Sequence, residues 1–169
     1  MQSPIAMTIL MLSITTPAFA ADGAAQPARP VDPDVIACTK VTQAEMEQFI
    51  GEPATIRETS ANLCSWDGGK PDAYVKVMYF VGEEQGVPAG KERAYFDQTI
   101  EGEKAENKPG EMVEIPGIGE SAWGLKIADN ETNYYAVYVF KNKDNVTIAT
   151  NGIGYDATVE IARLAASRM

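Results

Sequence analysis

Two apolar runs dominate the pattern of hydrophobic and polar positions along the chain. Residues 73–81 (AYVKVMYFV) and residues 133–140 (NYYAVYVF) are both dense in aromatic and β-branched side chains, which favour strands. The first run is almost continuously apolar, a pattern typical of a strand that is covered on both faces. We therefore expect residues 73–81 to form a central strand of a sheet.

Shorter segments separated by turn residues predict further strands. Residues 54–66 read as extended chain with an expected break near Ser60, and the cluster DGGKPD follows as a turn. The segment MVEIPGIGESAWGLKIA predicts a strand, a Pro-Gly turn and a second strand carrying Trp123. The residues KNKDN predict a hairpin turn from the strand at 133–140 into VTIAT.

A capping box predicts where the first helix begins. Thr42 is a favourable N-cap and Glu45 stands three residues later, with Val41 and Met46 placed to form a hydrophobic staple. Gly51 is the expected end of this helix. Cys38 would then lie on the incoming strand or turn.

Two further segments are amphipathic at the helical period. Residues 90–101 predict a helix that ends at Gly102 and that turns three side chains inward: Tyr95, Phe96 and Ile100. The C-terminal segment YDATVEIARLAASRM predicts another helix, with an expected buried face of Val159, Ile161, Leu164 and Ala165.

Strands outnumber helices and are joined by short turns, which favours an antiparallel sheet over alternating βαβ units. We predict an α+β fold, in which an antiparallel β-sheet of about five to six strands packs with three helices in a single domain at residues 35–169. The helices would cover one face of the sheet, or lie on both sides of a curved one.

The N-terminus has the features of an export signal. The apolar run at residues 5–14 is followed by small residues at Ala18 and Ala20, which predicts a signal peptide at residues 1–20 cleaved before Ala21. No Lys or Arg precedes the apolar run. Residues 21–34 are rich in Ala, Pro and Asp and predict a flexible tether. We expect no integral membrane segment after cleavage, and a periplasmic or secreted protein.

Cys38 and Cys64 are the two cysteines of the chain, and a cysteine pair of this kind can serve as a lipid anchor, a metal site, a redox couple or a structural disulfide. A lipid anchor is disfavoured because VIAC lies behind a Pro-rich stretch. Two thiols without any histidine fall short of a zinc site, and a C-x-x-C redox motif is absent. A structural disulfide in an oxidising compartment is the preferred interpretation, and closing a loop of roughly 25 residues contributes on the order of 3 kcal/mol.

Charge and composition exclude several classes of function. The net charge of −10 opposes binding to nucleic acid, which requires clustered Lys and Arg. The chain contains no histidine, which removes the commonest general base and the Ser-His-Asp arrangement. The two GIG segments do not extend to a dinucleotide-binding fingerprint and are expected to permit turns. We predict no cofactor and no metal, although DNET and KDN offer oxygen ligands for calcium.

Acidic and aromatic residues are the remaining candidates for a site. Two carboxylates could form an acid/base pair, and the same acids could contact a partner. Tyr79 and Tyr135 stand beside bulky apolar residues that could already fill the core, so either could be exposed to a partner. The candidate contact residues are Asp97, Glu101, Glu103, Glu111, Glu114, Glu120, Tyr79 and Tyr135.

Several short motifs follow one another along the mature chain: ACT before a helix ending at Gly51, CSW with Cys64 and Trp66, a V-K-V strand, IPGIGESA and an Ala-rich C-terminal helix. This order resembles a loose group of small exported and lipoprotein-type domains of unknown function. The chain departs from the lipoprotein members because Cys38 is not in a lipid-attachment box. The resemblance implies a disulfide-pinned α+β domain and brings no catalytic residues with it.

The sequence thus favours an exported, non-enzymatic domain that binds a protein or a cell-envelope component. The alternatives are a small-ligand carrier with an apolar pocket and a small carboxylate-dependent hydrolase.

Overall fold

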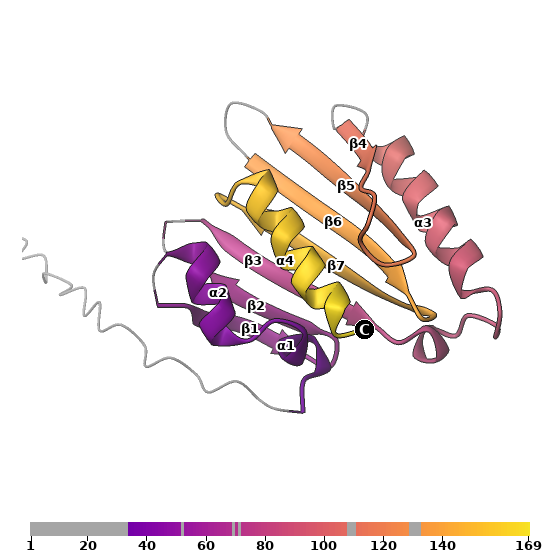
Figure 1. Cartoon of the computed structure of the whole chain (residues 1–169), viewed down its shortest axis with the longest axis horizontal. Coiled ribbons are helices and arrows are strands. Elements are labelled where there is room, and N and C mark those ends of the chain that lie inside the picture. The colour runs from indigo at the N-terminus through magenta and orange to yellow at the C-terminus, as the bar shows by residue number, and fades with distance from the viewer. Residues whose placement is uncertain (1–33, 52, 69, 71, 108–110, 129–132) are drawn as a thin grey trace, which may run out of the picture.

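Seven strands form one antiparallel sheet in the order β1-β2-β3-β7-β6-β5-β4 (Figure 1). The computed structural model describes residues 34–51, 53–68, 70, 72–107, 111–128 and 133–169. The predicted signal peptide and the predicted tether as far as residue 33 lie outside these residues. The α+β class and the single domain are confirmed, with one or two more strands than expected.

The strands are β1 (Thr55–Ser60), β2 (Leu63–Asp67), β3 (Tyr74–Phe80), β4 (Glu111–Glu114), β5 (Ser121–Ala128), β6 (Asn133–Lys141) and β7 (Asp144–Asn151). The helices are α1 (Ile36–Lys40), α2 (Gln43–Ile50), α3 (Glu92–Glu106) and α4 (Tyr155–Ser167), with a 3-10 turn, η1, at Gly82–Gln85. The described residues therefore form one α-helix more than the three predicted, because α1 is too short to show a helical period.

The predicted central strand, the predicted break near Ser60 and the predicted hairpin at KNKDN are present. β3 pairs with β2 on one side and with β7 on the other. The expected break near Ser60 is the turn between β1 and β2, which pair antiparallel. β6 and β7 form the hairpin expected at KNKDN. Asn142 and Lys143 adopt positive φ in that turn, as its backbone twist requires.

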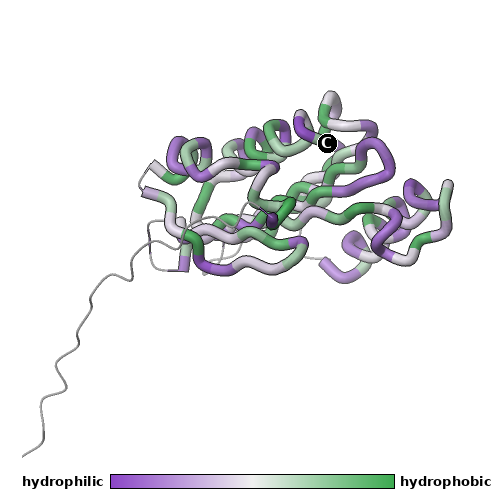
Figure 2. The backbone as a smooth tube through the Cα atoms, turned by 90° about the horizontal axis from the view of Figure 1, so that it is seen from below, coloured by the Kyte–Doolittle hydropathy of each residue, from purple (hydrophilic) through white to green (hydrophobic). Residues whose placement is uncertain are grey.

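The sheet has two faces that are covered differently. We call the face that packs against α1, α2 and α4 the major face, and the face that packs against α3 the minor face (Figures 1 and 2). Val75 and Val77 of β3 are fully buried on the major face, whereas Met78 of β3 is only partly buried on the minor face. Helices thus lie on both sides of the sheet.

Cys38 and Cys64 form a disulfide, with their Cα atoms 5.1 Å apart. Cys38 lies in α1, so the expectation of a strand or turn at this position is wrong. The bond joins α1 to β2 on the major face, beside the fully buried Trp66. A five-residue helix is unstable alone, so this bond and the packing of Ala37 and Val41 hold it in place.

α2 begins as its capping box predicts. The Thr42 hydroxyl accepts a hydrogen bond from the Glu45 backbone N–H, and the Thr42 N–H donates to the Glu45 carboxylate at 2.9 Å. Gly51 ends the helix with a φ of 75°, a conformation that glycine adopts without strain.

Two expectations for α3 are wrong. The helix continues through Gly102 to Glu106, because nothing crowds this exposed position and the cost of a glycine there is only about 1 kcal/mol. Tyr95 is 46% exposed. The side chains that α3 buries are Glu92, Phe96 and Ile100, and Tyr95 lies one position, or about 100°, away from that line.

On α4, Ile161 and Ala165 are fully buried as expected, while Val159 and Leu164 are only partly buried. None of the helices in the described part of the chain is long and apolar enough to cross a membrane.

Candidate functional site

α3 covers only part of the minor face. It packs through Phe96 and Ile100 onto side chains of β5, β6 and β7, including Leu125, Ala136 and Ala149. Toward β3, the minor-face side chains of Tyr74, Lys76, Met78 and Phe80 remain partly exposed. A step is therefore left between the helix and the uncovered part of the sheet.

This step forms a groove of about 340 Å³, which we call the α3–β3 groove. Its walls are side chains of α3, η1 and the minor face of β3, β6 and β7. The lining residues are Met78, Phe80, Gln85, Tyr95, Phe96, Thr99, Glu103, Tyr134, Tyr138, Asn145 and Thr147. Six of these described residues are aromatic or methionine side chains, and the other five are polar. That composition is typical of ligand-binding sites.

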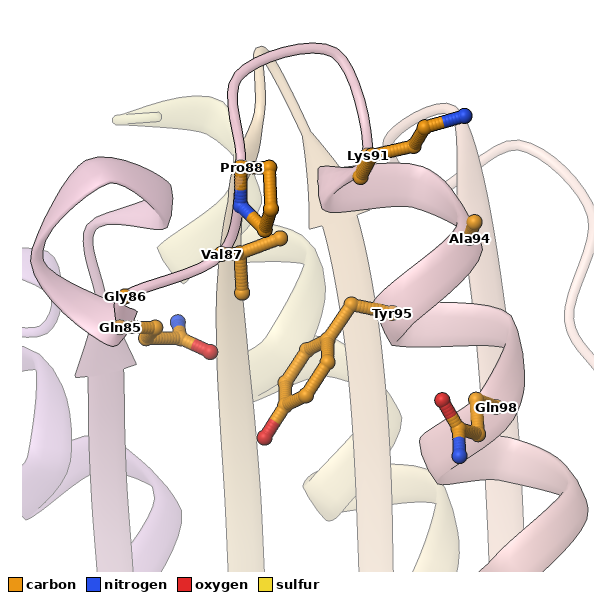
Figure 3. Close-up of a pocket in the computed structure, with 8 residues that line it drawn as sticks. All are labelled: Gln85, Gly86, Val87, Pro88, Lys91, Ala94, Tyr95 and Gln98. Atoms are coloured by element: carbon orange, nitrogen blue, oxygen red, sulfur yellow. The ribbon is translucent and has the colours of Figure 1, made fainter.

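A second pocket of about 370 Å³ adjoins the first between η1 and the start of α3. The two share Gln85 and Tyr95. Figure 3 shows the Tyr95 ring reaching from α3 toward η1, with the Gln85 amide pointing at it, while the Lys91 side chain points away. We call this second pocket the η1 pocket. Tyr95 therefore contributes to the walls of both pockets.

The Gln85 side chain has an unusual hydrogen-bond state. Its amide nitrogen, Nε2, is buried and has no partner among the described residues. A buried donor without an acceptor costs about 1–3 kcal/mol. Since Gln85 lines both pockets, an acceptor arriving in either one could satisfy it.

One carboxylate lies within the α3–β3 groove, against two tyrosines of β6. Glu103 comes from α3, and its Oε2 accepts a hydrogen bond of 2.8 Å from Asn107 Nδ2. Burial, and then the neighbouring Glu103 charge, raises the pKa of Tyr138; burial and the charges of Tyr74 and Glu103 raise the pKa of Tyr134. Both phenols are therefore neutral at any physiological pH.

The other acids predicted as contacts are spread over the surface. Asp97 pairs with Arg93 and Glu101 pairs with Lys104, both at 2.8 Å along α3. Glu111 and Glu114 lie on the edge strand β4, and Glu120 precedes β5, where it accepts a hydrogen bond from the Asn142 N–H. Of these six acids, Glu103 is the one that lines the groove.

The two predicted tyrosine contacts lie on the major face. Tyr79 is 7% exposed, and its hydroxyl hydrogen-bonds to Asp144, while the Lys40 ammonium lies 3.9 Å from its ring centre. Tyr135 is half-buried and packs edge-on against Tyr155 of α4. Tyr79 thus offers almost no surface to a partner, and neither residue lines the groove.

Acidic side chains also line a hollow of about 420 Å³ between α2 and α4. Glu45 there is bound to Arg168, and Glu160 lies 3.5 Å from Arg163. In the described parts of the chain, no group of three or more His, Cys, Asp or Glu side chains is placed to hold a metal ion.

Sequence reasoning missed most of the groove, including Met78, Gln85 and Thr147. The nearly continuous apolar run at 73–81 predicts coverage on both faces, which is wrong, because β3 alternates between buried and partly buried positions. That alternation was visible in the polar Lys76 within the run. The step beside α3 could not be found, because it depends on where the helix lies on the sheet.

Comparison with known proteins gives no relative to guide the assignment. No family model matches the chain, and no curated protein sequence matches it. The site must therefore be interpreted from its own geometry.

Proposed function

We propose that this protein is an exported, non-enzymatic domain that binds a protein or a component of the cell envelope, and that it does so in the α3–β3 groove. The observation that carries the proposal is the groove itself. Its lining includes Tyr95, which is 46% exposed, and the partly exposed minor-face side chains Met78 and Phe80 of β3. Exposed aromatic and apolar side chains in a groove are typical of interaction sites.

Export is supported by two separate features. The apolar run and the small residues at Ala18 and Ala20 match a cleaved signal. The Cys38–Cys64 bond is of the kind that persists in oxidising compartments.

A small-ligand carrier is a second candidate, which the volume of the groove favours. The volume of about 340 Å³ falls at the lower end of the range of small-molecule pockets. No comparable observation favours the hydrolase. A pair of carboxylates about 5–9 Å apart is needed for glycoside hydrolysis, and the described residues of the groove lining contribute one carboxylate, that of Glu103.

Photo-cross-linking in the native cell envelope tests the proposal. A photoreactive residue at Gln98, on the rim of the η1 pocket, should give a defined adduct. Thr147→Trp places a large ring inside the groove and should abolish that adduct. Thr59→Trp makes the same change at an exposed site on β1 and should leave the adduct intact.

Tyr95→Ala provides a milder test. The ring is 46% exposed, so its loss should change stability by no more than about 0.5 kcal/mol. It should also reduce the yield of the cross-linked adduct. Equal adducts from the wild type, Thr147→Trp and Tyr95→Ala would contradict the proposal. Native mass spectrometry that shows a small molecule, lost only in Thr147→Trp, would favour the carrier instead.

A further inference from the structure

We infer that the α3–β3 groove recognises a positively charged amine, namely a lysine side chain presented by an extended segment of the partner protein. The inference rests on the proposed function, which it narrows to one chemistry. Three observations carry it: the charge of the lining, the cation contacts elsewhere on the minor face, and the unpaired Gln85 amide.

Among the residues that the structure describes, the lining carries a negative charge and no positive one. Glu103 is the one ionisable side chain of the described lining besides its tyrosines, and no described Lys or Arg belongs to it. The next residue, Lys104, turns away: its ammonium pairs with Glu101 at 2.8 Å and lies 3.8 Å from the Trp123 ring centre. The Glu103 carboxylate accepts hydrogen bonds from Asn107 and Tyr138 but forms no ion pair with a described residue, so a cation in the groove could pair with it.

Other aromatic rings on this face already hold cations from the same chain. Arg57 and Lys76 lie 5.7 and 5.3 Å from the Tyr74 ring centre. Arg93 lies 5.7 Å from the ring centre of Phe140, and Lys104 lies over Trp123.

The three groove tyrosines differ from these rings. Tyr95, Tyr134 and Tyr138 have no such cation among the described residues, although two of them lie against a carboxylate. Aromatic faces beside a carboxylate form a favourable site for an ammonium group. Within the described part of the chain, no cation thus occupies the position that these rings and the carboxylate favour.

The Gln85 amide distinguishes a polypeptide from a small free ammonium. Its buried Nε2 lacks an acceptor at the boundary of the two pockets. A backbone carbonyl near the lysine supplies one, and the rest of the segment can continue into the η1 pocket beside Val87 and Pro88 (Figure 3). A small quaternary ammonium would fill the groove but leave Gln85 unpaired.

Nuclear magnetic resonance titration of the isotope-labelled mature chain tests this. The probes are the blocked tripeptide Gly-Lys-Gly, its neutral counterpart with norleucine in place of lysine, and choline chloride, each raised to high millimolar concentration. We expect saturable shifts at Thr147 and at the Gln85 side-chain amide with the lysine peptide, and binding about tenfold weaker with norleucine.

Two charge-neutralising variants of α3 provide the control. Glu103→Gln should remove the preference for lysine, whereas Glu106→Gln should keep it, because Glu106 is exposed on the same helix but does not line the groove. An unfolding midpoint close to that of the wild type in both variants would show that the difference is local.

The remaining outcomes overturn the inference in distinguishable ways. Equal binding of lysine and norleucine peptides would remove the charge preference while leaving the proposed function intact. Choline binding as tightly as the lysine peptide would replace the polypeptide by a small ammonium ligand. No saturable shift with any probe would also overturn the inference, and the cross-linking experiment would then judge the proposed function separately.

Discussion

The two faces of the sheet are built from the same strands but are covered by helices to different extents. On the major face, β3 contributes Val75 and Val77, both fully buried under helices and beside the disulfide. On the minor face, the alternate positions Lys76 and Met78 of the same strand stay partly exposed. One face is therefore closed by packing, and the other keeps a groove.

The helices explain this difference. α4 buries Ala162, Ala165 and Ala166, small side chains that let the helix approach the sheet closely. Its Thr158 hydroxyl forms a buried hydrogen bond of 2.7 Å with the Thr150 hydroxyl of β7. α3 places the bulkier Phe96 and Ile100 on its part of the sheet. The comparison predicts that stability depends mainly on the major face and binding mainly on the minor face.

Substituting the two tryptophans, one on each face, should give the largest difference in unfolding free energy between the faces. Trp66 is fully buried on the major face, whereas Trp123 is partly buried on the minor face under Lys104. Trp66→Ala should lower the free energy of unfolding by about 3–5 kcal/mol because it leaves a large cavity. Trp123→Ala should cost only about 1–2 kcal/mol. Urea denaturation measures both, and equal losses would contradict the comparison.

Removing the disulfide should have the next largest effect. The double variant Cys38→Ala, Cys64→Ala opens a link across a sequence separation of 26, and chain entropy gives a loss of about 3 kcal/mol. The loss should be seen in denaturation, while peptide-induced shifts at Thr147 stay unchanged because the bond lies on the other face. Reductant added to the wild type should reproduce the loss. If the peptide no longer shifts the Thr147 resonance while the variant remains folded, the two faces are not independent.

Much of this architecture was predictable because it depends on local signals. The capping box at Thr42 and Glu45 and the apolar runs of β3 and β6 each specify an element by residues close in sequence. The disulfide followed from the absence of any other use for Cys38 and Cys64. These features mostly concern the major face, where burial leaves a strong pattern.

The candidate site was less predictable for a physical reason. Tyr95 lies next to the buried Phe96, and a helical pattern read from sequence does not fix the rotation of α3 to within one residue. The environments of Glu103 and Gln85 depend on that rotation and on contacts with β6, far away in sequence. The acids were therefore identified as a group, without a way to single out the one in the groove.

The ion pair between Glu45 and Arg168 ties α2 to the end of α4 on the major face. Its hydrogen bonds from Arg168 lower the pKa of Glu45 from 4.5 to about 2. A lowered pKa means that the stabilisation is complete above the unfolded-state pKa and is lost as the pH falls through the folded-state value. Thr42 contributes a smaller part of the same shift.

The pH dependence of the unfolding free energy of Glu45→Gln should further distinguish the two faces. Glutamine can keep the capping box but not the charge. The variant should be less stable than the wild type by about 1 kcal/mol at neutral pH, because both side chains are partly exposed, and the gap should close between about pH 5 and pH 2. Asp97→Asn removes the corresponding charge from the Arg93 pair on α3, whose side chains are half exposed, and should cost less than about 0.5 kcal/mol. Urea denaturation across this pH range measures all three proteins. A gap for Glu45→Gln that is constant with pH would mean that the loss comes from the capping box of α2 and not from the ion pair with Arg168.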